Sequence, residues 1–152
     1  MKRTVAHLLA TCFGIGHAPV APGTVASFAS LLIYQLVPTL QQPLVLLPLV
    51  ILLTVAGIWA GSVMEELFGN DPSIVVIDEW VGQWLALLLI PHGWIPALLA
   101  FGFFRLFDIA KPWIIDRAQR LPHGWGIMAD DVLAGIAANV SVQLLMVGAA
   151  ML

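Results

Sequence analysis

Charged side chains are scarce in this sequence. Asp, Glu, Lys and Arg make up 10% of its 152 residues, whereas soluble domains average about 25%. Hydrophobic residues make up 61%, and the mean hydropathy is +0.98. The net charge of −3 and the lack of a basic stripe with interleaved aromatic residues argue against a nucleic-acid-binding protein. The composition is that of a membrane protein, and the length predicts a single membrane-embedded domain over residues 1–152.

The sequence has one cysteine, Cys12, which excludes an internal disulfide framework and a cysteine-based zinc site. It also lacks a Ser–His–Asp pattern, a cysteine-nucleophile motif and a Walker A loop. Lys2 and Arg3 precede an apolar run up to Phe13, as in a signal peptide or lipoprotein signal. Because His7 interrupts this run and a threonine precedes the cysteine, processing at this end is the weaker interpretation.

The charged residues fall into three blocks, at residues 2–3, 65–79 and 105–131. Uncharged spans of 61, 25 and 21 residues lie between or after these blocks, and one bilayer crossing needs about 20 apolar residues. The expected hydrophobic helices are Val25–Leu40, Pro43–Met64, Ile74–Ile90, Trp94–Phe107 and Val132–Leu152. The predicted fold class is therefore all-α, an integral membrane bundle of about five hydrophobic helices, some short or re-entrant.

The basic residues predict the orientation in the membrane. All six Lys and Arg residues lie at positions 2–3 or 105–120, which the positive-inside rule places in the cytoplasm. Two cytoplasmic segments require an even number of crossings between them, and the four intervening helices supply it. With this parity the loop 14–27, the acidic pair Asp78–Glu79 and the block 105–131 share the cytoplasmic face. The candidate functional groups therefore gather on one side of the membrane.

The block from Arg105 to Asp131 holds eight of the fifteen charged residues. Arg105 and Asp108 are one helical turn apart, and Lys111 follows at the same spacing before a proline ends the helix. Asp130 and Asp131 head the next apolar run, where the positive end of a helix would favour them. Ionisable groups in lipid are costly and usually functional. Bases at one end and paired acids at the other predict a site for a metal ion and a phosphate.

A second acid pair, Asp78–Glu79, lies inside an apolar segment, where an unpaired carboxylate would be very costly. It either pairs with basic residues of the 105–131 block or shares a divalent cation with the acid pair of that block. A glycine follows each acid pair by one helical turn, at Gly82 and Gly135, and this parallel slightly favours the shared cation site. The acids of residues 65–71 are expected to be solvated loop charges.

The loop from Gly14 to Ser27 is rich in glycine and proline. It predicts an ordered turn before a helix, with Thr24 as a reasonable N-cap. A plain connecting turn at the membrane surface is the interpretation that the spacing alone favours. The alternative is that free backbone N–H groups at the start of the helix receive an anion.

Three segments resemble motifs of the phosphatidylglycerophosphatase A family: GHAPVAPGTVAS, PSIVVIDEWVGQW, and FRLFDIAKPW continuing to HGWGIMADDVLAG. They occur in the order and spacing of that family and cover most of residues 14–136. The resemblance implies a mostly helical, magnesium-dependent phosphatase of the bacterial inner membrane. Its substrate would be phosphatidylglycerophosphate, which it would hydrolyse to phosphatidylglycerol and phosphate in phospholipid biosynthesis.

The chemistry that the resemblance implies assigns roles to the charged residues. The expected Mg²⁺ ligands are Asp78, Glu79, Asp130 and Asp131. The expected contacts to the substrate phosphate are Arg105, Lys111, His17 and Thr24. The expected catalytic carboxylates are Asp78, Asp108, Asp130 and Asp131. Asp108 is a further ligand, a base for the attacking water or the group that orients Arg105. Direct attack by water and a phosphoaspartate intermediate both fit these residues.

Two other classes of protein would share this composition. A small membrane transporter could use the acidic cluster to bind ions, but it should scatter its acids at the middle of the membrane in broken helices. A structural membrane subunit would explain the hydrophobicity, but not the convergence of acids and bases on one surface.

Overall fold

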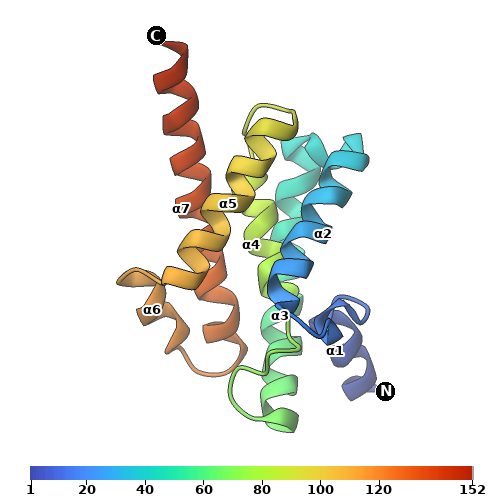
Figure 1. Ribbon diagram of the computed structural model, residues 1–152. Helices are drawn as coiled ribbons and strands as arrows, with labels where there is room; N and C mark the ends of the chain where they lie inside the picture. Colours follow the sequence, from blue (N-terminus) through green and yellow to red (C-terminus); the bar gives the residue numbers. More distant parts are fainter. Residues whose placement is uncertain (152) are drawn as a thin grey trace.

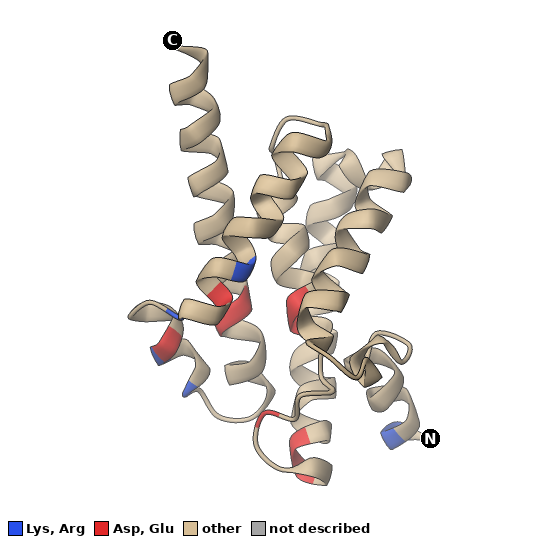
Figure 2. Ribbon diagram, in the orientation of Figure 1, with Lys and Arg blue, Asp and Glu red and all other residues tan. Residues whose placement is uncertain are grey.

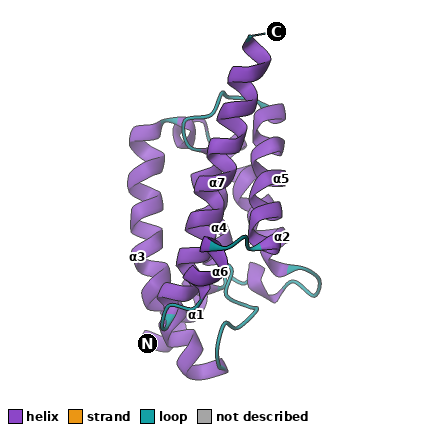
Figure 3. Ribbon diagram, turned by 90° about the vertical axis from the view of Figure 1, so that its left-hand side faces the viewer, coloured by secondary structure: helices purple, strands orange, loops and turns teal. Residues whose placement is uncertain are grey.

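The computed structural model describes residues 1–151, and within these residues the chain forms helices and loops without a strand (Figures 1 and 3). The elements of this part of the chain are α1 (Lys2–Ala10), η1 (Ile15–His17), α2 (Pro22–Leu36), η2 (Pro38–Gln41), α3 (Pro43–Phe68), α4 (Ile77–Leu87), α5 (Trp94–Ala110), α6 (Ile114–Gln119) and α7 (Gly124–Ala150), where η1 and η2 are 3₁₀ helices. The predicted all-helical class is confirmed. The predicted count of five membrane helices is not, because α3 and α7 alone among the described helices are long and apolar enough to cross a bilayer.

Helix α4 is short and lies at the centre of the bundle, where it packs against α7, α2, α3 and α5 (Figure 1). At about 1.5 Å per residue, its 11 residues extend roughly 16 Å, about half of a hydrocarbon core of ~30 Å. The sequence predicts a longer helix over Ile74–Ile90. The observed helix therefore begins and ends inside the bundle, and both of its ends need partners there.

Glycines allow α4 and α7 to pack closely. A Cβ atom on Gly82 would lie 2.7 Å from the main-chain oxygen of Asp131, and one on Gly135 would lie 2.4 Å from that of Gly82. Helix α3 also packs closely on α7: a Cβ atom on Gly57 would lie 2.5 Å from Met128 Sδ, and one on Gly61 would lie 3.3 Å from Gly124 Cα. Their four-residue spacing is the small-residue pattern that lets helices approach closely. The space that a side chain would occupy at the glycine after each acid pair is taken up by the backbone of the other helix. This close crossing brings the two acid pairs together.

The observed start of α2 differs from the predicted one. Ala21, in the left-handed region at φ 46°, is the N-cap, and Pro22 is the first helical residue. Proline suits this position because its ring fixes a helical φ and it lacks an N–H that would be unpaired there. The prediction of Thr24 as the N-cap is therefore wrong. The helix ends at Leu36, two residues before Pro38, as expected from the restriction that proline places on the preceding residue.

Helix α7 begins at Gly124, so Asp130 and Asp131 lie in its second turn. The prediction that these acids sit at the start of the helix is wrong. The error arose because Gly124 and Gly126 suggest a turn. In the structure both glycines are helical, and a Cβ atom on either would collide with a main-chain oxygen of α3 or α6. They serve close packing of three helices.

The charged residues marked in Figure 2 lie from about the middle of the bundle downward, and none lies near its upper end as drawn. We call this lower part of the bundle the charged end; it contains α1, the loop 69–76, and α6 with its flanking loops. The opposite half, the apolar end, contains the loop 88–93, η2 and the C-terminal part of α7. The charged residues therefore gather at one end of the molecule, while their position on one side of a membrane stays a prediction.

Candidate active site

A cavity of about 310 Å³ opens at the charged end. Its walls come from the start of α2, the segment before α4, the start of α4, the end of α5 and the second turn of α7. The lining residues are Ala21, Pro22, Gly23, Thr24, Asp71, Ser73, Val75, Asp78, Glu79, Arg105, Asp108, Lys111, Asp130 and Asp131. Eight of the fifteen charged residues of the chain are among them. Segments that are remote in the sequence therefore converge on one polar hollow.

The structure brings together almost all of the residues predicted for the site. The predicted residues that line the cavity are Thr24, Asp78, Glu79, Arg105, Asp108, Lys111, Asp130 and Asp131. His17, a predicted phosphate contact, is not among them. Its side chain is exposed, and its ring stacks on that of His7 with 5.1 Å between the ring centroids.

Asp78, Glu79 and Asp131 form a tight acidic group, which we call the acid trio. One carboxylate oxygen from each lies within 4.8 Å of the other two. The residues Asp78 and Asp131 are only 8% and 3% exposed. Asp78 Oδ1, Glu79 Oε2 and Asp131 Oδ2 are buried without a hydrogen-bond partner. A buried carboxylate without a partner is very unfavourable, and Mg²⁺ prefers a few carboxylate oxygens. The acid trio therefore fits a divalent cation.

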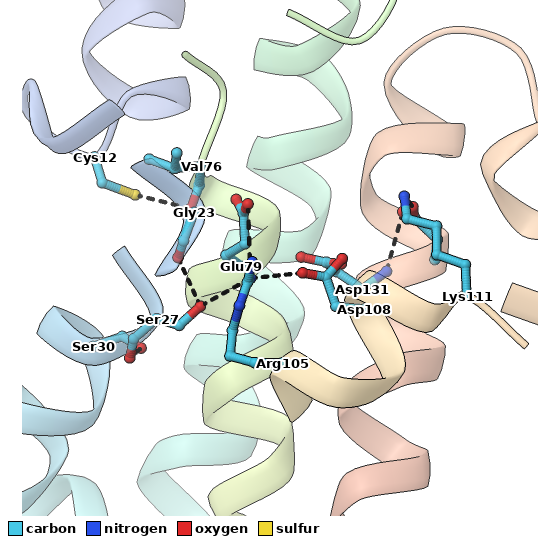
Figure 4. A network of polar contacts seen from close by, with 11 residues as sticks. Cys12, Gly23, Ser27, Ser30, Val76, Glu79, Arg105, Asp108, Lys111 and Asp131 are labelled. Carbon is cyan, nitrogen blue, oxygen red and sulfur yellow. Dashed lines mark hydrogen bonds and ion pairs between the residues drawn. The ribbon is translucent and has the colours of Figure 1, made fainter. Parts of the chain in front are cut away.

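Arg105 is held beside the acid trio by one of its terminal nitrogens (Figure 4). Its Nη1 lies 2.6 Å from Asp108 Oδ2 and 4.0 Å from Glu79 Oε1. The same nitrogen donates a 3.4 Å hydrogen bond to Ser27 Oγ, and that hydroxyl donates to the carbonyl oxygen of Gly23 at 2.8 Å. The Nε of Arg105 is buried without a partner. The guanidinium is thus oriented by protein groups and keeps a donor for another acceptor.

Lys111 pairs with Asp130, with 2.6 Å between Nζ and Oδ2. Lys111 ends α5 in the left-handed region at φ 41°, and this bend directs the chain into Pro112. Burial works against the charge on the ammonium, but the hydrogen bond and the charge of Asp130 outweigh it and raise the pKa of Lys111. Asp130 Oδ1 accepts a hydrogen bond from the N–H of Asp131. Asp130, a predicted metal ligand, is therefore engaged by protein groups and lies outside the acid trio.

The centre of the cavity is strongly anionic. Besides the exposed Asp71, the charged residues that line the cavity are Asp78, Glu79, Arg105, Asp108, Lys111, Asp130 and Asp131. Five acids against two bases give a net charge of −3 when all are ionised. Two unit charges 4 Å apart interact by about 4 kcal/mol at an effective dielectric constant near 20. A phosphate would therefore be repelled unless cations entered with it, and one divalent cation would reduce the net charge to −1.

Several contributing residues were missed in the sequence. A Cβ atom on Gly23 would lie 1.8 Å from Glu79 Oε1, so the start of α2 packs directly on that carboxylate. Gln83, one turn after Glu79, is fully buried, and neither its Nε2 nor its Oε1 has a partner. The sequence feature that could have identified Gln83 is a polar amide side chain within an otherwise apolar segment. Asp71, predicted to be a solvated loop acid, is exposed but lines the cavity and accepts a hydrogen bond from Gln119 at 3.2 Å.

The chain is similar to known proteins over nearly its whole length. The family model of phosphatidylglycerophosphatase A matches residues 8–146. A Bacteroides thetaiotaomicron protein named "Putative phosphatidylinositol-3-phosphatase" is 42% identical over 90% of this chain and 91% of its own length. Phosphatidylglycerophosphatase A of Escherichia coli is 36% identical over 86% of this chain and 77% of its own length. The Haemophilus influenzae protein of the same name is 37% identical over 90% and 85%, respectively. No solved structure matches the chain.

Proposed function

The chain belongs to the phosphatidylglycerophosphatase A family, and we propose that it hydrolyses phosphatidylglycerophosphate to phosphatidylglycerol and phosphate in phospholipid biosynthesis. Its class, a phosphoric monoester hydrolase, follows from the family. The observation that carries the proposal is the convergence of the acid trio with Arg105 and Lys111 in one cavity. Family membership does not favour a transporter or a structural subunit.

The acid trio is the proposed Mg²⁺ site, because its buried oxygens lack partners and its carboxylates lie close together. A bound Mg²⁺ would neutralise charge on the phosphate oxygens as the phosphoryl group transfers. Asp130 lies next to this group in the sequence but keeps Lys111 in place. We therefore assign Asp78, Glu79 and Asp131 to the metal and Asp130 to the positioning of Lys111.

Arg105, Lys111 and Thr24 are the proposed contacts to the substrate phosphate. Hydrolysis of a phosphate monoester is extremely slow without a catalyst, and catalysis depends mainly on positioning and charge neutralisation. The guanidinium of Arg105 suits phosphate oxygens because it can donate two parallel hydrogen bonds. Its ion pair with Asp108 at 2.6 Å fixes its orientation. Thr24 lies in the first turn of α2, where unpaired backbone N–H groups favour an anion.

The charged end is proposed to face the cytoplasm of a bacterial cell, with α3 and α7 crossing the inner membrane. All six Lys and Arg residues lie at this end, as the positive-inside rule requires of cytoplasmic segments. Thiol labelling of intact cells tests the orientation in a Cys12→Ser background. A membrane-impermeant reagent should label Arg117→Cys only after lysis and should label His92→Cys from outside. Labelling of Arg117→Cys from outside would reverse the orientation.

Cys12, which that background removes, would itself contribute little labelling. Burial, together with the negative charge of Glu79, raises the pKa of its thiol to about 12. The thiol also donates to the carbonyl oxygen of Val76 at 3.7 Å. Because thiolates are the reactive form, the native cysteine should label poorly even where it is retained.

A second substrate, phosphatidylinositol 3-phosphate, is suggested by the Bacteroides relative, which is named "Putative phosphatidylinositol-3-phosphatase". Both substrates are phosphate monoesters on a lipid, so the acid trio and the two bases would serve either one. Phosphate release by purified protein should be compared on phosphatidylglycerophosphate and phosphatidylinositol 3-phosphate. We expect the kcat/KM on phosphatidylglycerophosphate to be about 10-fold higher or more. The reverse preference would establish the second substrate, and no release from either lipid would refute the proposed function.

A further inference from the structure

An apolar hollow of about 500 Å³ lies between α5, α6 and α7, and we call it the α6 groove. Its lining residues are Phe107, Pro112, Trp113, Ile114, Ile115, Leu133, Ile136 and Ala137. No charged side chain lines it. Trp113 and Ile114 are 92% and 66% exposed, so the groove is open to the surroundings of the protein. Large apolar side chains in such an open position mark a surface that contacts another apolar molecule.

The α6 groove borders the candidate active site. Phe107 lines the groove and its neighbour Asp108 lines the cavity; Pro112 lines the groove and its neighbour Lys111 lines the cavity. One side of the C-terminal end of α5 therefore lines the α6 groove, and the other side lines the cavity of the candidate active site. Along α7 the cavity ends at Asp131, and the groove continues from Leu133 to Ala137. At about 1.5 Å per residue, Ala137 lies roughly 9 Å beyond Asp131, toward the apolar end.

We propose that the α6 groove binds one acyl chain of the lipid whose phosphate occupies the cavity, an inference that rests on the proposed function. The cavity is walled largely by charged groups and, at about 310 Å³, suits a headgroup rather than an acyl chain. The groove begins at the level of this headgroup and runs toward the apolar end, as the tail of an inner-leaflet lipid does.

The groove orients the substrate rather than attracting it. An acyl chain in a bilayer is already in an apolar environment, so little hydrophobic free energy is gained when the chain moves into the groove. The gain comes from fixing the chain, because a held glycerol backbone places the phosphate at the acid trio and Arg105 in one orientation. A small misplacement at a reacting centre lowers a rate strongly.

A second apolar hollow provides the control. It has a volume of about 230 Å³ and is lined by Leu98, Leu99, Gly102, Phe103 and Leu106 of α5. None of these residues lines the cavity. If bulk lipid merely fills surface hollows, the two hollows should be equivalent for activity. If the α6 groove holds the substrate chain, filling it should affect turnover and filling the control hollow should not.

The test compares Ala137→Phe, which fills the α6 groove, with Gly102→Phe, which fills the control hollow. A Cβ atom on Gly102 would meet nothing within 4 Å, so the control substitution has room. Each variant is assayed on a long-chain and a short-chain, water-soluble phosphatidylglycerophosphate. Ala137→Phe should lower kcat/KM on the long-chain lipid on the order of 10-fold and leave the short-chain value unchanged. Gly102→Phe should change neither value, and thermal unfolding should show both variants folded.

Equal losses on the two substrates, or no loss in Ala137→Phe, would overturn the proposal. If wild-type protein hydrolyses neither substrate, the proposed function fails, and the groove is then tested by binding. A phosphatidic acid with a diazirine in its acyl chain is photolysed with the protein in mixed micelles. Crosslinks concentrated at residues 112–115 and 133–137, and reduced in Ala137→Phe, would support the groove. Crosslinks spread evenly over the lipid-facing helices would refute it.

Discussion

The two ends of helix α4 are both buried, but they differ in whether their polar groups have hydrogen-bond partners. At the C-terminal end the main-chain carbonyl groups that the helix leaves free have side-chain partners. Asn139 Nδ2 of α7 donates to the carbonyl oxygens of Ala86 and Leu88. The hydroxyl group of Tyr34 on α2 donates a hydrogen bond to the carbonyl oxygen of Leu87 at 3.4 Å. Side chains of α7 and α2 thereby pair the carbonyl groups of Ala86, Leu87 and Leu88 at this end of the helix.

At the N-terminal end of α4 the polar groups lack such partners. Asp78 Oδ1 and Glu79 Oε2 are buried without a hydrogen bond, as is Asp131 Oδ2 of the adjacent helix. One turn further along α4, both polar atoms of Gln83 are also buried without a partner. Most buried polar groups in proteins are paired, as the carbonyl groups at the other end of α4 are. The contrast supports the proposal that the unpaired oxygens of the acid trio bind a cation.

The largest expected effect comes from neutralising the acid trio. Asp78→Asn, Glu79→Gln and Asp131→Asn should each lower phosphate release by at least about 100-fold, a magnitude typical for loss of a main electrostatic group. Their midpoints of thermal unfolding should stay equal or rise, because an amide removes repulsion between close carboxylates. The matched control is Asp116→Asn, an acid of the charged end that pairs with Arg120 outside the cavity. Near-normal turnover by Asp131→Asn would contradict the assignment.

The next effect concerns the groups that orient the phosphate. Arg105→Lys should lower kcat/KM by roughly 10-fold to 100-fold, since a point charge does not reproduce a two-donor fork. Asp130→Asn, which loosens Lys111, should give a loss of similar or smaller size. Neither change should weaken the binding of divalent cations. Normal kinetics in Arg105→Lys would instead identify this arginine as a counter-ion for Asp108.

A smaller effect, on stability rather than activity, is expected at the other end of α4. Asn139→Leu should lower the free energy of unfolding by about 1–2 kcal/mol, because it leaves buried carbonyl groups unpaired. Turnover at moderate temperature should stay within about twofold of wild type. The control is Ser141→Ala, whose hydroxyl bonds only within its own helix. Loss of turnover without loss of stability in Asn139→Leu would contradict the assignment of a structural role to the C-terminal end of α4 and a functional role to its N-terminal end.

The smallest effect is expected at His17. Its ring stacks on His7 and does not line the cavity, so His17→Ala should change kcat/KM by less than about twofold. Thr24→Val, at the cavity wall, should reduce it more. A loss of about 10-fold or more in His17→Ala would restore the role that the sequence suggests for this residue.

The sequence predicts which charged residues lie together better than it predicts the helix boundaries. Charges in a 61% hydrophobic chain are rare enough that their clustering is informative. The glycine one turn after each acid pair also indicates the close crossing that brings Asp78 and Asp131 together. These signals are local in the sequence and depend on physical costs that every membrane-embedded chain shares.

The boundaries could not be predicted because tertiary contacts determine them. The apolar run from Ile74 to Ile90 has no internal stop signal, and α4 ends at Leu87 where Asn139 and Tyr34 meet its carbonyl groups. Asp130 has the same residue type as Asp131 and is adjacent to it. Only the fold shows that one pairs with a lysine and the other does not.

Binding of a divalent cation tests the central claim most directly, because it does not depend on the identity of the lipid. Purified protein is stripped with a chelator and titrated with Mn²⁺ as a substitute for Mg²⁺, and free Mn²⁺ is followed by electron paramagnetic resonance. Wild type and Lys111→Ala should bind the cation, and Asp131→Asn should bind it on the order of 10-fold or more weakly. No binding by wild type, or equal binding by wild type and Asp131→Asn, would contradict the account.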